Sequence, residues 1–408
     1  MSRPVEVSIL RNPEGPLVFT APVEWAVRHL AGVLTSCGLP VFAGSSMPAG
    51  ITARLHIHVT AAQDRTAAEA LSQAGIECPQ GPESFGIVNQ AESGVPILTV
   101  VGSDAAGLVY ALTDLADVAQ CSADPLCALC SVPSRSERPA NAVRSITRLF
   151  TSEPEDKPWF YDRSFWDEYL TELAAQRFNR FTFSVGCGYD YLIDKIVMDN
   201  YFCFFYPFVL DVPGYEVRVE GLPAEERDRN LDMLRYIGQC CRERGLEFRL
   251  GLWNHSYDYG PQNTHGKYRI LGIDASNHTA YCRDALAALL QACPEIGGLT
   301  FRVHFEGGVP EPTHAFWRTV MERIGEAENL IDIDFHSKGV TDELLEILQG
   351  TGKRFVLSTK FWGEHMGPPY HQASIRAREF YGGTRVDAAN SRTSTTPSTG
   401  HHETDVRG

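Results

Sequence analysis

The sequence predicts an α/β protein: a small mixed α/β domain over residues 1–135, then a (β/α) TIM-type barrel over residues 141–383 that is incomplete at its C-terminal end. The composition of the 408 residues, 43% hydrophobic and 21% charged, is typical of a folded globular protein. Strand and helix patterns alternate along the chain, which indicates parallel β/α units. No Gly-x-Gly-x-x-Gly loop follows a predicted strand, which favours a barrel over an open doubly wound sheet, the alternative fold.

The first 135 residues contain both periodicities. A period of two, with apolar residues alternating, predicts strands at Val5–Leu10, Arg54–Val59, Phe85–Val88 and Val95–Val101. A period near 3.6 predicts helices at Glu24–Leu34, Ala67–Ala74 and Ala105–Ala119, the last capped by Ser103 or Asp104. These elements predict a mixed α/β domain.

The segment Cys121–Ala140 is rich in Ser, Pro and Cys and is predicted to be a linker. Cys121, Cys127 and Cys130 lie close together, but no second pair of metal ligands lies nearby. We therefore predict free thiols here and neither a metal nor another cofactor in the protein.

From Arg144 onward, strands and helices alternate regularly. The predicted strands are Arg144–Phe150, Phe178–Val185, Leu246–Trp253, Leu299–Glu306, Leu330–His336 and Phe355–Phe361. The predicted helices are Ser164–Gln176, Pro223–Arg244, Thr279–Ala292, Thr313–Ala327 and Asp342–Gln349. Six strands are two fewer than a TIM barrel has. Residues 384–408 have no apolar periodicity and many Ser, Thr and Gly, so we expect a disordered tail.

Charge and hydropathy limit the partners. A net charge of −15 argues against nucleic acid as the main partner, because phosphate binding needs a basic surface. The most apolar stretch, Tyr201–Val212, is too short to span a bilayer, so no membrane partner is expected. No secretory signal is visible at the N-terminus, and the eleven cysteines are then best interpreted as reduced thiols. These observations predict a cytoplasmic enzyme; the oligomeric state stays open.

Ionisable residues recur where three successive predicted strands end. In a barrel, alternate residues of a strand point inward and catalytic groups lie at the C-terminal ends. The candidate inward sets are Arg302, His304 and Glu306; Asp332, Asp334 and His336, with Lys338 just beyond; and Lys360, Trp362 and Glu364. Phe301, Val303 and Phe305 would face the helices instead. An ion pair of Arg302 with Asp332 or Asp334 is a purely structural alternative.

Paired carboxylates at such a site are typical of glycoside hydrolysis. We expect Glu306 to be the acid, with its pKa raised by burial next to Phe305, and Glu364 or Asp334 to be the base. An inverting enzyme would separate the two carboxyls by about 6.5–9.5 Å, a retaining one by about 5–5.5 Å, and we favour inversion.

Cations and aromatic residues accompany the carboxylates. Arginine and lysine would hold an anionic sugar such as a uronic acid, and aromatic rings would stack on it. The candidate substrate-binding residues are Arg148, Trp253, Arg302, His304, His336, Lys338, Lys360, Trp362, Tyr370 and His371. The sequence thus predicts a glycoside hydrolase acting on an acidic, uronic-acid-containing glycan.

Two segments carry a family resemblance. Val100–Leu112 (VVGSDAAGLVYAL) is similar to the end of the small α/β domain that precedes the barrel in β-hexosaminidase-like and α-glucuronidase-like glycoside hydrolases. Val303–Pro310 (VHFEGGVP) resembles the strand end that bears the general-acid glutamate of α-glucuronidases, with Phe305 where that family has Ser. The resemblance covers the domain order over about residues 1–380. It implies that Glu306 is the acid and that Asp334 and Glu364 occupy the places of the base.

Two other functions remain open. His304, Glu306, Asp334 and His336 could coordinate a divalent cation in a metal-dependent barrel enzyme acting on a sugar. A truncated barrel could instead bind carbohydrate without catalysis, because missing strands leave exposed sheet edges.

Overall fold

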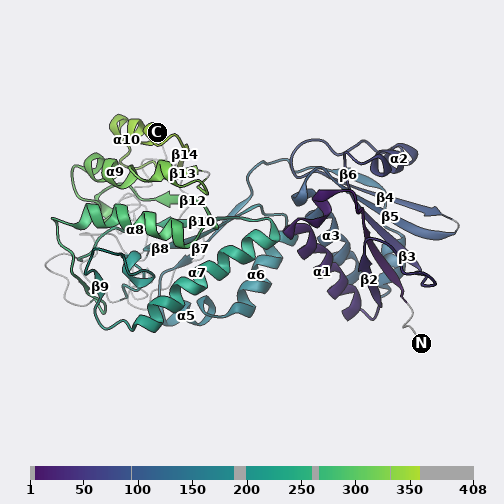
Figure 1. Cartoon of the computed structure of the whole chain (residues 1–408), viewed down its shortest axis with the longest axis horizontal. Coiled ribbons are helices and arrows are strands. Elements are labelled where there is room, and N and C mark those ends of the chain that lie inside the picture. Colours follow the sequence, from purple (N-terminus) through teal and green to yellow (C-terminus); the bar gives the residue numbers. More distant parts are fainter. Residues whose placement is uncertain (1–4, 93, 188–198, 260–265, 331, 359–408) are drawn as a thin grey trace, which may run out of the picture. The chain divides into compact units, whose positions relative to one another are not determined.

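The structure, a computed structural model, describes residues 5–92, 94–187, 199–259, 266–330 and 332–358. They form two compact units. Unit 1 contains residues up to 146 together with 164–180 and 239–247; unit 2 contains residues 147–163, 181–238 and those from 248 onward. The predicted α/β class is confirmed, since each unit combines strands of a six-stranded sheet with helices (Figure 1). The domain boundaries at 135 and 141 stay a prediction.

Unit 1 is built on a mixed sheet with the strand order β2-β1-β3-β5-β4-β6. Its strands are β1 (Val7–Arg11), β2 (Val41–Gly44), β3 (Leu55–Ala61), β4 (Phe85–Glu92), β5 (Val95–Gly102) and β6 (Arg135–Glu137). Pairing is parallel from β2 through β5, whereas β4 pairs antiparallel with both β5 and β6.

Helices cover both faces of this sheet (Figure 1). They are α1 (Ala21–Ser36), α2 (Arg65–Ala74), α3 (Ala105–Gln120) and α4 (Pro125–Cys130). Helix α6 (Arg163–Ala175) also belongs to unit 1, except for its first residue. Because neighbouring side chains of a strand point to opposite faces, Val100 joins the core beneath α1 and α3 while Val101 packs against α2.

The segment predicted as a linker carries secondary structure. Residues Pro125–Cys130 form helix α4, capped by Asp124, and Arg135–Glu137 form the edge strand β6. The segment was interpreted as a linker because its Ser, Pro and Cys residues are typical of loops; Leu126 and Leu129 are nevertheless buried in the core of unit 1. Cys121, Cys127 and Cys130 are free thiols.

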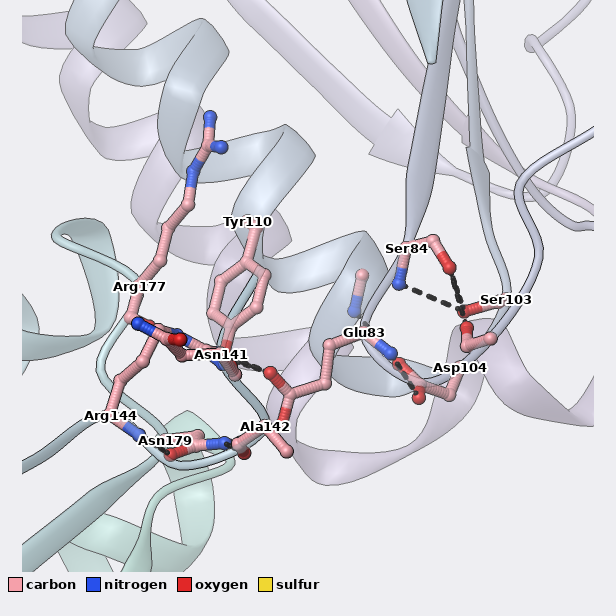
Figure 2. Close-up of polar contacts among 12 residues, drawn as sticks. Glu83, Ser84, Ser103, Asp104, Tyr110, Asn141, Ala142, Arg144, Arg177 and Asn179 are labelled. Atoms are coloured by element: carbon pink, nitrogen blue, oxygen red, sulfur yellow. Dashed lines mark hydrogen bonds and ion pairs between the residues drawn. The ribbon is translucent and has the colours of Figure 1, made fainter. Parts of the chain in front are cut away.

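A polar cluster ties together segments of unit 1 that lie far apart in the sequence (Figure 2). The Arg144 guanidinium pairs with the Glu83 carboxylate and donates to the Tyr110 hydroxyl at 2.9 Å. Asn179 Nδ2 donates to the same carboxylate at 2.8 Å. Hydrogen bonds thus hold Arg144, which precedes β7 (Ser145–Phe150), and Asn179, which precedes β8 (Arg180–Val185), against the loop before β4.

Unit 2 is built mainly on the second sheet, with the strand order β14-β13-β12-β10-β8-β7. Its strands are β7 (Ser145–Phe150), β8 (Arg180–Val185), β10 (Glu247–Leu252), β12 (Ile296–Phe301), β13 (Asp332–His336) and β14 (Arg354–Ser358). The pairs from β10 through β14 are parallel, as predicted. Among the described residues, β14 and β7 are the two edges of this sheet.

Helices follow the strands along the chain (Figure 1). They are α5 (Glu153–Phe160), α7 (Ala224–Arg244), α8 (His278–Ala292), α9 (Thr313–Met321) and α10 (Asp342–Gly350); β9 (Arg218–Val219) and β11 (Ile270–Leu271) form a short ribbon. Trp317 of α9 packs its ring on Phe301 and Phe335, with centroids 5.0 and 5.1 Å away. One face of β12 and β13 is therefore covered by helix, which leaves the polar face for a site. No helix of the described residues is long and apolar enough to cross a membrane.

Candidate active site

The site is organised by the turn that follows β12. The predicted strand Leu299–Glu306 is too long: β12 ends at Phe301, and Phe305–Gly307 form a 3-10 turn closed by Gly308 at φ 70°. Only glycine fits there for two reasons: a positive φ is unfavourable for other residues, and a Cβ on Gly308 would overlap the backbone of Ser256. Phe305 is 42% exposed and does not face the helices as expected, because the turn breaks the alternation.

Glu306 lies between two cations. Its carboxylate accepts a hydrogen bond from Arg302 Nη2 at 2.5 Å and bonds from Lys338 Nζ at 2.8 and 2.9 Å. Burial favours a higher pKa for Glu306, but the Lys338 bond and the two positive charges outweigh it and lower the pKa. The raised pKa expected from burial near Phe305 is therefore wrong, and Glu306 is ionised at neutral pH.

His304 is buried beside this carboxylate. Its Nδ1 lies 3.7 Å from Glu306 Oε2, and within the described residues neither ring nitrogen has a hydrogen-bond partner. Burial, reinforced by the charge of Arg302, lowers the pKa of His304 to about 4. The neutral imidazole therefore keeps one donor and one acceptor for another group.

Trp253 and His336 come from the strands on either side of β12. Trp253 follows β10, His336 ends β13, and their ring centroids are 5.5 Å apart. Gly339, after β13, lies so close to His304 that a Cβ would be 2.7 Å from the His304 Cβ. The ends of β10, β12 and β13 thus converge, as the predicted parallel order requires.

Asp334 lies on the same face of β13 as His336. Its carboxylate accepts hydrogen bonds from Ser358 Oγ at 2.6 Å and Thr300 Oγ1 at 3.4 Å. Burial raises the pKa of Asp334 despite these bonds. Asp334 is therefore more readily protonated than an ordinary aspartate, the opposite of Glu306.

Asp332 serves a structural pair. It is fully buried and pairs with Arg249 of β10 and with Arg354 of β14, the latter at 2.6 Å. The structural alternative was an ion pair of Arg302 with Asp332 or Asp334. In the contacts that the structure describes, Arg302 pairs with Glu306 instead. Sequence reasoning missed Arg249. Alternate residues of a strand share a face, so the spacing of Arg249 and Trp253 by four residues could have predicted that both lie on the polar face.

The remaining predicted residues lie elsewhere. Arg148 of β7 places its guanidinium 4.0 Å from the ring centre of Trp159. Lys360, Trp362, Glu364, Tyr370 and His371 lie outside the described residues.

The charges around Glu306 bear on the metal alternative. Two cations already occupy the carboxylate and would repel a divalent ion. In the described part of the chain, no three His, Cys, Asp or Glu side chains gather as a metal site.

Comparisons with known proteins agree with the fold. No family model and no curated protein matches the sequence. A solved structure described as a GH138 enzyme targeting pectin rhamnogalacturonan II is similar, with a TM-score of 0.54 and 17% identity. The match covers 87% of this chain but only 38% of that one. The expected resemblance to glycoside hydrolases is thereby confirmed at the level of the fold.

Two further solved structures match more loosely. The GH20 β-N-acetylhexosaminidase from Streptomyces coelicolor A3(2) has a TM-score of 0.45 at 15% identity, covering 87% of this chain and 70% of that one. A structure described as CpGH84D has a TM-score of 0.46 at 9% identity, covering 90% and 54%.

Proposed function

We propose that the protein is a glycoside hydrolase that cleaves an acidic, uronic-acid-containing glycan by carboxylate acid/base catalysis with inversion. The observation that carries this proposal is a pair of carboxyls from neighbouring strands with opposite pKa shifts: Glu306, which follows β12 and is held by Arg302 and Lys338, and Asp334 of β13. Two carboxyls with opposed pKa shifts are the requirement of glycosidase chemistry.

The pKa directions favour a division of roles that reverses the sequence-based one. A general base must be ionised, and the two cations keep Glu306 so. A general acid must hold its proton, which burial favours at Asp334. Glu306 then activates water while Asp334 protonates the leaving oxygen. Glu364 stays an alternative partner among the residues that are not described.

The cations at Glu306 support an anionic substrate. Arg302 and Lys338 both meet the single carboxylate of Glu306. Lys338 has three N–H donors and gives its described bonds to one carboxylate, while its side chain is 38% exposed. A uronic acid carboxylate can take the remaining donor.

Two neighbouring groups can hold the sugar itself. The Trp253 ring offers an apolar surface, and sugar rings stack on such surfaces with their hydroxyls at the rim. The buried nitrogens of His304 can exchange hydrogen bonds with those hydroxyls.

Activity on a panel of aryl glycosides tests the proposal. We expect turnover of aryl uronides and little of the neutral sugars. Glu306→Gln and Asp334→Asn should each lower kcat by about 10²–10⁴-fold. Glu311→Gln is the matched control, because Glu311 is exposed and bonds its own loop at Thr313. Full activity in the Glu306→Gln enzyme would overturn the role of this residue, and a retained product anomer by NMR would overturn inversion.

One observation favours a second candidate, carbohydrate binding without catalysis. A carboxylate engaged by two cations is also what a purely structural ion pair looks like. Thermal shifts with free uronic acids separate the two functions. A shift that persists in Glu306→Gln while no glycoside is cleaved by the native chain would favour the binding protein.

A further inference from the structure

A cavity of about 1070 Å³ lies beside α5 in unit 2. It is lined by Ser152, Glu153, Pro154, Lys157, Pro158, Tyr161, Asp162, Asp199, Arg229 and Lys267. None of these residues belongs to the set around Glu306. Binding pockets for small molecules have about this size, so the cavity can hold one or two sugar rings.

One wall of the cavity is apolar. Pro154, Pro158 and Tyr161 are spaced four and three residues apart, which places them on the same side of the chain along α5. The Tyr161 hydroxyl donates to Asn230 Oδ1 at 2.6 Å, so its ring is fixed in orientation. A rigid wall of proline and tyrosine rings suits the C–H face of a pyranose.

Glu153, one of three acidic residues of the lining together with Asp162 and Asp199, is paired with lysines. Glu153 accepts bonds from Lys157 at 2.7 Å, from Lys267 at 2.6 Å and from the Tyr268 hydroxyl at 2.6 Å. Burial favours a higher pKa for Glu153, but these bonds outweigh it and lower the pKa. Lys157 also pairs with Glu226 at 2.6 Å, so the charges of the two lysines balance those of Glu153 and Glu226 together.

Arg229 is the uncommitted cation of the lining. Its guanidinium carbon lies 3.8 Å from the centre of the Tyr161 ring, a cation–π contact that holds the guanidinium over this ring. Among the residues that the structure describes, no carboxylate forms an ion pair with Arg229. An arginine held on an aromatic ring with its donors free is suited to bidentate binding of a carboxylate.

We propose that this cavity is an accessory binding site for a uronic acid residue of the glycan, separate from the residues that carry out hydrolysis. Arg229 grips the sugar carboxylate, and the Pro154, Pro158 and Tyr161 wall meets the ring. Asp162 and Asp199 accept from ring hydroxyls. The inference rests on the proposed glycan substrate, whose chain would occupy both sites.

The test is binding of trigalacturonic acid to the full chain, measured by calorimetry and located by hydrogen–deuterium exchange. The Glu306→Gln protein is used so that the probe is not consumed. We expect slower exchange over residues 153–162 on binding. Arg229→Ala should weaken this binding about tenfold, the effect of losing a charge-assisted bond pair. Arg227→Ala is the matched control, an arginine on the same helix that pairs with Asp211 and Asp228 instead.

Four results would overturn the accessory site: no protection over residues 153–162, unchanged protection in Arg229→Ala, the same loss in Arg227→Ala, or equal protection by neutral maltotriose. An unchanged melting temperature in Arg229→Ala shows that the variant is folded, and Arg229→Lys should restore part of the affinity. The readout is binding alone, so protection by trigalacturonic acid stands even if the native chain cleaves no glycoside. Conversely, cleavage without protection removes the accessory site and leaves the proposed hydrolase.

Discussion

At the scale of single residues, the surroundings of a carboxyl decide its chemistry more than its identity does. Glu306 is buried and Asp334 is half-buried, both beside polar neighbours, yet their pKa values move in opposite directions. Glu306 faces two cations, whereas the direct partners of Asp334 are the hydroxyls of Ser358 and Thr300. The difference arises because full charges outweigh the cost of burial and neutral hydroxyls do not.

Replacing Lys338 should make this balance visible in the pH dependence of stability. The folded pKa of Glu306 lies below its unfolded value, so the contribution of Glu306 to the free energy of unfolding is fully present above the unfolded pKa, about 4.3. It is lost as the pH falls through the folded pKa. Lys338→Met should raise the pKa of Glu306, lower stability at pH 7 by about 1–3 kcal/mol and flatten the decline in acid.

Urea denaturation between pH 3 and pH 7 measures this change. Lys353→Met is the control, because Lys353 donates to the Ala327 carbonyl at 2.5 Å and its described contact is not with a carboxylate. It should keep the acid-range slope of the native chain. An identical slope in Lys338→Met would contradict the role given to Lys338.

At the scale of elements, periodicity predicted the sheet strands well and the loops poorly. β13 keeps Ile333 and Phe335 against the helices and Asp334 on the opposite face, as its period of two predicts. The turn after β12 escaped prediction, because Gly308 adopts a left-handed conformation that an alternating pattern does not reveal. Helix α5 was missed as well, since Pro154 and Pro158 are typical of loops.

The pairing of distant residues could not be predicted from the sequence. Arg249 and Asp332 are 83 residues apart in the sequence. Their strands are separated by β12, and the residue of β12 that pairs with both of them is Gly298. The two side chains meet because this glycine has no side chain. A Cβ on Gly298 would overlap the Arg249 guanidinium. Local sequence patterns predict the face of the sheet on which a residue lies. Its contact partner depends also on the strand order and on the size of the residue between them, here Gly298.

This buried pair yields a prediction about the second sheet. Asp332→Asn should lower the free energy of unfolding by about 3–5 kcal/mol, because it removes the buried carboxylate charge that pairs with Arg249. Arg354→Gln should cost about 1 kcal/mol or less, since Arg354 is 63% exposed and its charge is hydrated in either case. Urea unfolding compares the two variants; equal losses would refute the distinction.

At the scale of the whole molecule, the chain passes between the two units repeatedly. Helix α7 is continuous, yet its residues up to 238 belong to unit 2 and the rest to unit 1. Strand β10 likewise begins with one residue of unit 1 and continues in unit 2. An element shared in this way cannot stay folded in one unit after the other has unfolded, which favours a single cooperative transition over two independent ones.

Perturbing each unit separately tests that cooperativity. Gly107→Ala should destabilise unit 1 by about 1–3 kcal/mol, because a Cβ there would overlap the Ser84 carbonyl. Gly32→Ala is its matched control: Gly32 lies inside helix α1 with open space around its Cα, so alanine should stabilise by about 0.5–1 kcal/mol. Asp332→Asn supplies the perturbation in unit 2.

If the units are coupled, Gly107→Ala and Asp332→Asn each lower one common melting temperature, and the calorimetric and van't Hoff enthalpies agree in both variants. Independent units would give two transitions, with each variant moving only its own. The tryptophans separate the cases further, since Trp25 and Trp166 report on unit 1 while Trp253 and Trp317 report on unit 2. Replacing both Trp25 and Trp166 by Phe removes these two reporters of unit 1. If the units are coupled, the remaining fluorescence transition in Gly107→Ala should still move with the circular dichroism of the whole protein. A fluorescence transition that stayed in place while the circular dichroism transition shifted would show that the shared helix does not couple the units.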